Sequence, residues 1–387
     1  MPRPIIAGMR GGAAVGSGVR AVRIVTGLIL LVFVTCHLSN LIIGLRSLDA
    51  MEAARPWLMG PWRTGPGITL LAGAAIVHIL LGLYAIASRR SLAVSKTDVV
   101  QLLLGLATPP LLLNHAVVMH TAGEVTPGFD ATFGQFLAIY WSFTPRYAFQ
   151  QILVVMIVWM HASVGLYSWL VLKPVWRRVG GLVLPLLFAI PILALLGFAE
   201  AGKEVLARLA GDPAWSAHIR DNLIKVGRVT SQLDAFQARI LITYGALLAI
   251  AMAIFGARML AGLGKRVTVA YDGGLSASCR PGLSILDMSR LNDIPHAQVC
   301  SGRGRCGTCR VRVDAGAARL SPIEDLERET LERVGAESTD RLACQARVLG
   351  EGVAVTRLLP AFADASAARA PQEWAGEPAA AAPEATP

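Results

Sequence analysis

The chain has 387 residues, of which 54% are hydrophobic and only 16% are charged, and its mean hydropathy is +0.54. A soluble domain has about a quarter of its residues charged, so this chain has too few polar residues to be a water-soluble globule. The basic residues behind the net charge of +10 concentrate at the ends of apolar runs, as in membrane proteins, so we expect no nucleic-acid partner.

Six stretches of 18 to 26 residues contain no Asp, Glu, Lys or Arg. Each is long enough, at about 1.5 Å per residue, to cross a hydrocarbon core of roughly 30 Å. The sequence therefore predicts an N-terminal segment 1–20 followed by an all-α six-helix transmembrane bundle within residues 21–262. We expect its helices at about residues 24–45, 64–88, 99–123, 147–172, 179–199 and 240–257.

The segments that join these stretches carry their basic residues unevenly. One side has 13 Lys and Arg residues in short segments, including Arg20, Arg23 and Lys173, whereas the other side has four in short segments and six in the long segment 200–239, where five acidic residues nearly balance them. The positive-inside rule then predicts a multi-pass protein of the bacterial inner membrane, in contact with the lipid bilayer, with both termini in the cytoplasm. The long segment 200–239 falls outside, where it forms either a short interfacial helix or a plain linker.

Five of the seven histidines lie in apolar stretches, where an ionisable side chain is costly and therefore a functional candidate. Counted from the cytoplasmic helix ends at about 1.5 Å per residue, His78 and His161 lie roughly 15–17 Å deep, and His37 and His115 roughly 21–24 Å deep. His120 falls at the outer rim and is the alternative to His115. Paired imidazoles at one depth are what a bis-histidine haem b requires, so we predict one or two haems, on an inner pair and an outer pair.

A short repeat accompanies the inner histidines. The pattern H-x3-G-L-Y occurs at His78 and again at His161, so that Gly82 and Gly165 follow one helical turn after each histidine, and Gly44 follows His37 at a longer distance. Glycine on the face of a ligand leaves room for a flat macrocycle. The alternative is ordinary packing of helices through small residues.

Four histidines on four helices in this order resemble the dihaem cytochrome b anchors of succinate dehydrogenase and fumarate reductase. That family has five helices, so the likeness covers about residues 20–175 of this chain. It implies a quinone site beside a haem, with three polar side chains as candidates for the quinone carbonyls: Ser39, Asn40 and Asn114. Four arginines are candidates for the haem propionates, or are simple topology signals: Arg89, Arg90, Arg177 and Arg178.

The composition changes after Gly264. Residues 266–271 alternate as a strand does, and Asp272-Gly-Gly274 is a hairpin turn, so the sequence predicts a small soluble α+β domain over residues 265–359. Residues 361–387 are rich in Ala and Pro without periodicity, which predicts a disordered tail.

Four of the five cysteines in this domain form one pattern. Cys300, Cys306 and Cys309 have the spacing C-x5-C-x2-C, and Cys344 follows after 34 intervening residues, within Arg-Leu-Ala-Cys-Gln. Three thiolates on one tight loop plus a distant fourth is the arrangement that binds a [2Fe–2S] cluster, with two ligands to each iron. A zinc site needs the same four thiolates but usually has two separate C-x2-C pairs, and disulfides conflict with a cytoplasmic location. Cys279 stands outside the pattern.

The stretch from Cys300 to Val313, with Leu-Ser-Pro-Ile-Glu at 320–324 and Arg-Leu-Ala-Cys-Gln at 341–345, resembles ferredoxins of the plant and adrenodoxin superfamily. The resemblance covers about residues 265–358 and implies a β-grasp fold and one-electron transfer. These ferredoxins are usually acidic, whereas this domain is slightly basic.

The two parts together resemble the N-terminal half of certain bacterial membrane-bound class III adenylate cyclases, although we expect no cyclase domain on this chain. We therefore predict a membrane electron-transfer protein that passes single electrons between a quinone pool, b-type haem and a cytoplasmic cluster. It would work with an unidentified cytoplasmic redox partner, and a homo-oligomer is a further expectation. The alternatives are a redox or quinone sensor that signals to a separate effector such as a nucleotide cyclase, and a ferredoxin that is merely tethered.

Overall fold

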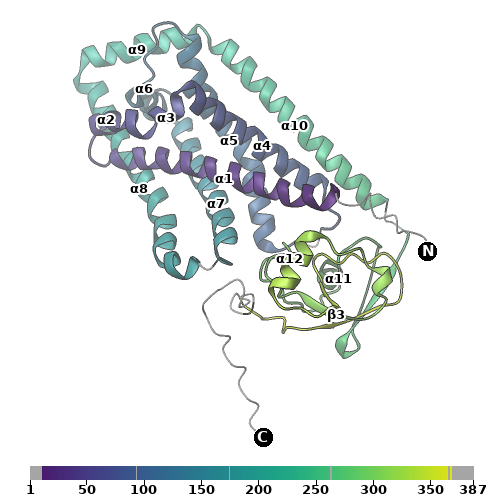
Figure 1. The fold of residues 1–387 in the computed structure, drawn as a ribbon. Coiled ribbons are helices and arrows are strands. Elements are labelled where there is room, and N and C mark those ends of the chain that lie inside the picture. The colour runs from purple at the N-terminus through teal and green to yellow at the C-terminus, as the bar shows by residue number, and fades with distance from the viewer. Residues whose placement is uncertain (1–10, 93, 174, 262–263, 365–366, 368–387) are drawn as a thin grey trace.

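The computed structural model describes residues 11–92, 94–173, 175–261, 264–364 and 367. Residues 1–10 and most of the predicted tail 361–387 lie outside the described residues. The chain forms a bundle of long helices, and a small sheet domain lies at one end of that bundle (Figure 1).

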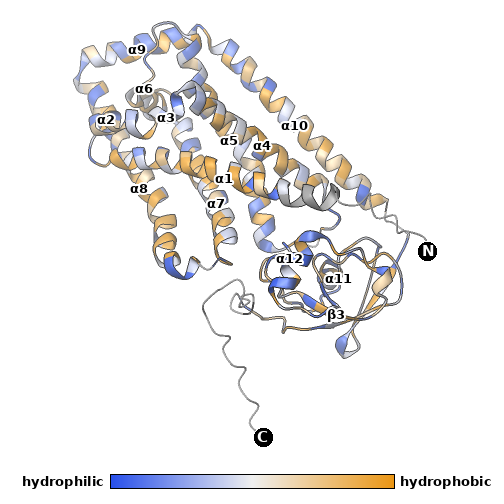
Figure 2. Cartoon of the chain, in the orientation of Figure 1, coloured by the Kyte–Doolittle hydropathy of each residue, from blue (hydrophilic) through white to orange (hydrophobic). Residues whose placement is uncertain are grey.

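In the described part of the chain, six helices are long and apolar enough to cross a membrane. Apolar residues dominate these helices, and polar residues gather towards the bundle ends and on the sheet domain (Figure 2). The six helices are α1 (Gly11–Ile43), α4 (Gly65–Ala87), α5 (Lys96–Val125), α7 (Arg146–Leu170), α8 (Trp176–Gly211) and α10 (Thr230–Leu260).

Shorter elements cover the end of the bundle that lies away from the sheet domain (Figure 1). All of them except α3 pack with α1, α7 and α8 around one apolar core, which includes Leu38, Met51, Phe136 and Ile219. These elements are α2 (Leu48–Leu58), α3 (Gly60–Arg63), α6 (Phe133–Ala138), the π-helical turn η1 (Ile139–Phe143) and α9 (Pro213–Gly227).

The helix ends differ from the expected ones in two places. Helix α1 begins by Gly11, so part of the predicted N-terminal segment 1–20 is helical and reaches the sheet domain, where it contacts α12. Segment 200–239 is neither a lone interfacial helix nor a linker, because α8 continues to Gly211, α9 follows and α10 begins at Thr230. Charged residues end an apolar run but do not end a helix, since Lys, Glu and Arg are good helix formers.

The C-terminal domain is a five-stranded mixed sheet with the order β2-β1-β5-β3-β4. The pair β1–β2 is antiparallel around the predicted Asp272–Gly274 turn, and β1 pairs with β5 in parallel. Inward residues of the strands and of α11 form its core. The elements are β1 (Val267–Tyr271), η2 (Asp272–Gly274), β2 (Ser276–Cys279), α11 (Ile285–Leu291), β3 (Arg310–Ala315), η3 (Ala317–Arg319), α12 (Asp325–Arg333), β4 (Asp340–Leu342) and β5 (Val353–Arg357).

Candidate metal centres

The four patterned cysteines come together beside the sheet. Cys300, Cys306 and Cys309 lie on the loop between α11 and β3, and Cys344 follows directly after β4. The three loop cysteines are buried, Cys344 is half-buried, and all four are free thiols. The fifth cysteine of the domain, Cys279, ends β2, where Asn292 Nδ2 donates a hydrogen bond to its sulfur at 3.2 Å.

The backbone of the loop folds around the Cys300 sulfur. Positive φ angles occur at Ser301, Gly302, Gly304 and Gly307, a conformation that favours glycine. These turns bring the N–H groups of Arg303, Arg305 and Cys306 to the sulfur. The hydrogen bond from the Cys306 thiol and these backbone donors hold the pKa of Cys300 well below its usual range. The loop is therefore built to stabilise thiolate charge.

The thiols are grouped as two pairs. Cys300 contacts Cys306, and donation to Cys300 together with burial raises the pKa of the Cys306 thiol. Cys344 contacts Cys309 in the same way, which with burial raises the pKa of Cys344. Cys300 also lies within electrostatic range of Cys344, so the two pairs are close to each other. Two pairs of thiols fit a centre with two irons and two thiolates on each.

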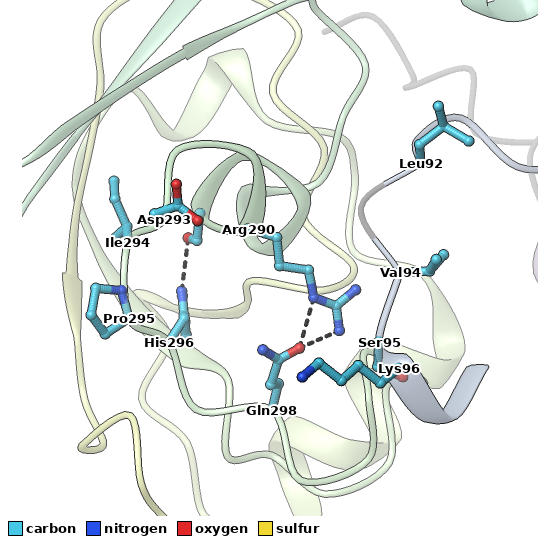
Figure 3. Close-up of a pocket in the computed structure, with 11 residues that line it drawn as sticks. Leu92, Val94, Ser95, Lys96, Arg290, Asp293, Ile294, Pro295, His296 and Gln298 are labelled. Atoms are coloured by element: carbon cyan, nitrogen blue, oxygen red, sulfur yellow. Dashed lines mark hydrogen bonds between the residues drawn. The ribbon is translucent and has the colours of Figure 1, made fainter. Parts of the chain in front are cut away.

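A cleft of about 510 Å³ opens near the loop, between the α4–α5 connector and the end of α11. Lys96, the first residue of α5, faces Gln298 and Arg290, and Arg290 Nε donates to Gln298 Oε1 at 2.7 Å (Figure 3). His296 bonds to Ser289 Oγ at 3.0 Å, and burial lowers the pKa of His296 to about 4. None of the four patterned cysteines lines this cleft, so it is separate from the thiol site.

The inner histidine pair meets between α4 and α7. The ring centroids of His78 and His161 are 6.2 Å apart, with an interplanar angle of 89°. The two rings are close enough together that both could bind one metal ion, which they would hold between α4 and α7.

Hydrogen bonds orient both rings of this pair. Thr26 Oγ1 lies 2.8 Å from the carbonyl oxygen of Val22 and 3.2 Å from His78 Nδ1, so His78 Nδ1 is the donor when the hydroxyl donates to Val22. His161 Nδ1 lies 3.1 Å from the carbonyl oxygen of Gln101, which can only accept, so His161 Nδ1 carries the hydrogen. In this arrangement the Nε2 atom of each ring carries the lone pair that would bind a metal ion. The Gln101 amide nitrogen lies 3.5 Å from His161 Nε2, at the limit of a hydrogen bond.

The outer pair joins α1 to α5. The ring centroids of His37 and His115 are 5.8 Å apart, and Phe33 stacks on His37 at 6.1 Å. Tyr140 Oη lies 3.4 Å from His115 Nδ1, whereas the buried Nδ1 of His37 has no partner in the described part of the chain. His120 is elsewhere, half-exposed and 3.5 Å from Glu124. The structure thus brings together the two pairs predicted by depth and leaves His120 out of both.

Glycines that the sequence did not single out face the inner histidines. A Cβ atom at Gly27 of α1 would lie 3.1 Å from His78 Cε1, and one at Gly105 of α5 would lie 2.8 Å from His161 Cε1. Gly27 and Gly105 lie on other helices than the histidines they face, so a repeat around each histidine could not reveal them.

The glycines of the repeat have other surroundings. A Cβ at Gly44 would lie 2.8 Å from the backbone oxygen of Gly197, so Gly44 serves the packing of α1 on α8, as the alternative interpretation stated. A Cβ at Gly165 would lie 3.2 Å from the Gln101 amide, and one at Gly82 would meet nothing within 4 Å.

The other polar candidates of the membrane part have partners of their own. Asn40 Nδ2 donates to the carbonyl of Met51 at 2.8 Å, and Asn114 Oδ1 accepts from Gln237 at 3.4 Å. Of the arginines proposed for haem propionates, Arg89 and Arg90 follow α4, and the carbonyl of Arg90 accepts a hydrogen bond from Arg280. Arg177 and Arg178 lie in the first turn of α8.

A small mixed sheet with three thiols on a glycine-rich loop and a fourth after a neighbouring strand defines an iron–sulfur protein of the ferredoxin class. The 2Fe-2S iron-sulfur cluster binding domain family matches residues 270–349. Through this C-terminal domain the chain belongs to the 2Fe-2S ferredoxin family, whose chemistry is electron transfer.

Individual relatives match the same domain. The 2Fe-2S ferredoxin-5 of Aquifex aeolicus is 37% identical over 76 residues, which are 19% of this chain and 79% of the relative. A 2Fe-2S ferredoxin of Pseudomonas aeruginosa is 35% identical over 83 residues, which are 21% of this chain and 74% of the relative. The solved structure of an ISC-like [2Fe-2S] ferredoxin from Pseudomonas putida is 26% identical and covers 25% of this chain and 94% of its own, with a TM-score of 0.22.

Proposed function

We propose that this chain is a membrane-bound electron-transfer protein that passes single electrons between a cytoplasmic [2Fe–2S] cluster, b-type haem in the bundle and a quinone pool. The cluster ligands in this proposal are Cys300, Cys306, Cys309 and Cys344. The haem ligands are His78 with His161 and His37 with His115. The bundle spans the bacterial inner membrane with the ferredoxin domain on the cytoplasmic side.

One observation carries the haem assignment. His78 and His161 face each other at 6.2 Å, and each donates through Nδ1 to a fixed acceptor on another helix. With its Nδ1 hydrogen so engaged, each ring keeps the lone pair on Nε2, which is the form in which histidine binds a metal. Burial among apolar helices disfavours protonation of Nε2, because it would place a charge in the membrane.

In this proposal different residues orient the haem ligands and hold the cluster thiolates. Thr26 and the Gln101 carbonyl hold the imidazoles in their tautomer and orientation. The glycine-rich loop holds the thiolates of the cluster with backbone donors. When bound, a b-type haem supplies an iron that gains and loses one electron without a proton. Centres at two depths divide a membrane of about 30 Å into shorter distances.

The quinone part of the proposal is supported by polar atoms near the outer pair. Asn40 Oδ1 and Gln151 Nε2 are buried without a partner in the described part of the chain, and Gln151 contacts His115. Such atoms are costly to leave unpaired, and a quinone carbonyl or hydroxyl satisfies them. Oxidation of a reduced quinone by the purified protein, followed by the haem spectrum, tests this part, and no haem reduction by quinol contradicts it.

The haem part is tested by iron and pyridine-haemochrome assays on the full chain purified in detergent. We expect two haems and two further irons per chain. His78→Ala and His161→Ala should remove the same haem, His37→Ala and His115→Ala the other, and His120→Ala, the matched control, neither. Iron from the cluster with no haem would leave a tethered ferredoxin and overturn the assignment.

A further inference from the structure

Two arginines in the cluster loop contact the helical bundle. Arg303 and Arg305 lie in the five-residue gap between Cys300 and Cys306. Arg303 Nη2 is 2.7 Å from Asp98 Oδ1 in the first turn of α5. Arg305 donates to two carbonyl oxygens in the last turn of α7, those of Ser168 at 3.3 Å and Trp169 at 3.1 Å. One loop thus holds the ends of two helices.

The electrostatics of the helix ends favour both contacts, that of Arg305 at the end of α7 and that of Arg303 at the start of α5. The last carbonyls of a helix lack intrahelical donors and form the negative end of its dipole. The Arg305 guanidinium at the end of α7 supplies both hydrogen-bond donors and a positive charge. Asp98 is capped by Ser95, with its N–H donating to the Ser95 hydroxyl at 3.1 Å, and it is only 18% exposed. Ser95 Oγ donates to Asp98 Oδ2 at 2.8 Å, and Arg303 adds the opposite charge to this partly buried carboxylate.

An apolar contact lies beside the arginines. Leu172, directly after α7, packs in one buried cluster with Cys300 and Cys306, and Val171 and Val299 complete it. Cys309, by contrast, is buried in the core of the sheet domain, where Cys344 packs against it. The thiol pair Cys300–Cys306 is therefore the pair that faces the bundle.

The two helices that the arginines contact, α5 and α7, carry Gln101 and His161, which are joined by a hydrogen bond. Gln101, whose carbonyl accepts from His161, lies three residues after Asp98 on α5 and hence on nearly the same face. His161 itself lies on α7, about two turns before Ser168. The loop contacts therefore fix the position of the thiol pair relative to His161 through two rigid helices.

We propose that the Cys300–Cys306 loop is the surface by which the ferredoxin domain docks on its own membrane domain, with Arg303 and Arg305 as positioning residues. This contact would hold the Cys300–Cys306 side of a bound cluster towards the His78–His161 pair, so that a single electron could pass from the cluster to a haem held there with no bond made or broken. The route rests on the proposed haem, whereas the docking does not. A soluble protein cannot reach this face of the cluster while the domain is docked.

The test uses the full chain in detergent, with the cluster reduced by photogenerated deazaflavin radical, a small molecule whose access does not depend on docking, and with direct haem reduction measured in Cys306→Ser and subtracted. Three charge variants are compared: Arg303→Asp, Asp98→Arg and the double exchange. The matched control is Arg312→Asp, on the exposed face of β3, where the arginine pairs with Asp314. Cluster and haem contents are measured first in every variant, so that loss of either centre is recognised before rates are compared.

Each single variant should slow haem reduction by at least about tenfold, because a partly buried ion pair is lost and like charges are opposed. The same variants should speed reduction of added soluble cytochrome c by the cluster and cleavage by trypsin at Lys265 and Arg266 in the linker. The double exchange should restore all three readouts towards wild type, and Arg312→Asp should leave them unchanged.

The outcomes separate the two proposals. The docking would be overturned if both single variants have wild-type cluster and haem contents and show unchanged rates of haem reduction and of trypsin cleavage. Faster trypsin cleavage in the single variants of a chain that carries no haem would support the docking while the haem proposal fails.

Discussion

A Cβ atom at Gly105 of α5 would lie 2.8 Å from Cε1 of His161 on α7. This distance is shorter than ordinary contact between carbon atoms, which is about 3.5–4.0 Å. Only glycine allows the imidazole to keep its place, and the α5 backbone that leaves this space also provides the Gln101 carbonyl for His161 Nδ1. One turn of α5 thus determines both where the His161 ring lies and which nitrogen it presents.

The first prediction follows from that contact. Gly105→Val should displace the His161 ring and remove the inner haem, while the outer haem and the cluster stay. Haem stoichiometry by pyridine haemochrome measures the loss. Gly73→Ala on α4, where a Cβ meets nothing within 4 Å, is the control and should keep full haem. Full haem in Gly105→Val would show that the ring tolerates a side chain there.

The second prediction concerns the cluster ligands. Cys306→Ser and Cys344→Ser should each abolish the visible and EPR spectrum of the cluster, because each removes one of two thiolates from an iron. Cys279→Ser should keep it, since the Cys279 sulfur only accepts a hydrogen bond from Asn292. An intact cluster spectrum in Cys306→Ser would contradict the ligand set, and bound zinc without iron in the wild-type chain would contradict the centre.

The third prediction concerns the strand that delivers Cys344. Glu327 on α12 is 1% exposed, pairs with Arg341 at 2.8 Å and accepts the N–H of Leu342. Glu327→Ala should lower the free energy of unfolding of the domain by about 3–5 kcal/mol, because it leaves Arg341 buried without its partner.

The matched control lies on the same helix. Arg328 pairs with Asp325 at the surface, so Arg328→Ala should change the free energy of unfolding by less than about 1 kcal/mol. Denaturant unfolding and the rate of cluster loss measure both variants. Equal effects of Glu327→Ala and Arg328→Ala would show that burial of the ion pair does not matter.

The fourth prediction concerns the charge near the cluster. Arg20 of α1 lies within electrostatic range of Cys300 and of Arg303 and Arg305. A reduced cluster carries one more negative charge, so a nearby cation favours reduction. Arg20→Gln should lower the midpoint potential by roughly 20–60 mV, the equivalent of about 0.5–1.4 kcal/mol for one electron. Arg20→Lys keeps the charge and should restore most of the potential. A rise in potential in Arg20→Gln, measured by EPR redox titration, would contradict this.

The sequence could indicate the thiol loop and the depth of the histidines, because both depend on local rules. Helical rise is nearly constant, so residue number gives depth, and the structure places His78 beside His161 and His37 beside His115. The C-x5-C-x2-C loop needs glycine at fixed places for its positive φ angles, and Gly302, Gly304 and Gly307 provide them.

What the sequence missed depends on how helices rotate against one another. The local repeat points to Gly82 and Gly165, which follow histidines in the same helix, yet the glycines that approach the inner rings, Gly27 and Gly105, lie on other helices. Similarly, charge at the membrane edge points to Arg89 and Arg90, whereas the arginines that join the two parts come from the cluster loop.

By itself, the sequence determined the number of apolar helices, the ferredoxin domain and the spacing of the four thiols, since each follows from composition, periodicity or a short motif. Only the tertiary structure decided that Arg303 meets Asp98 and that the Cys300–Cys306 pair faces the end of α7. These contacts join residues more than a hundred positions apart. They depend on the packing of whole helices, and no local pattern in the chain encodes which faces meet.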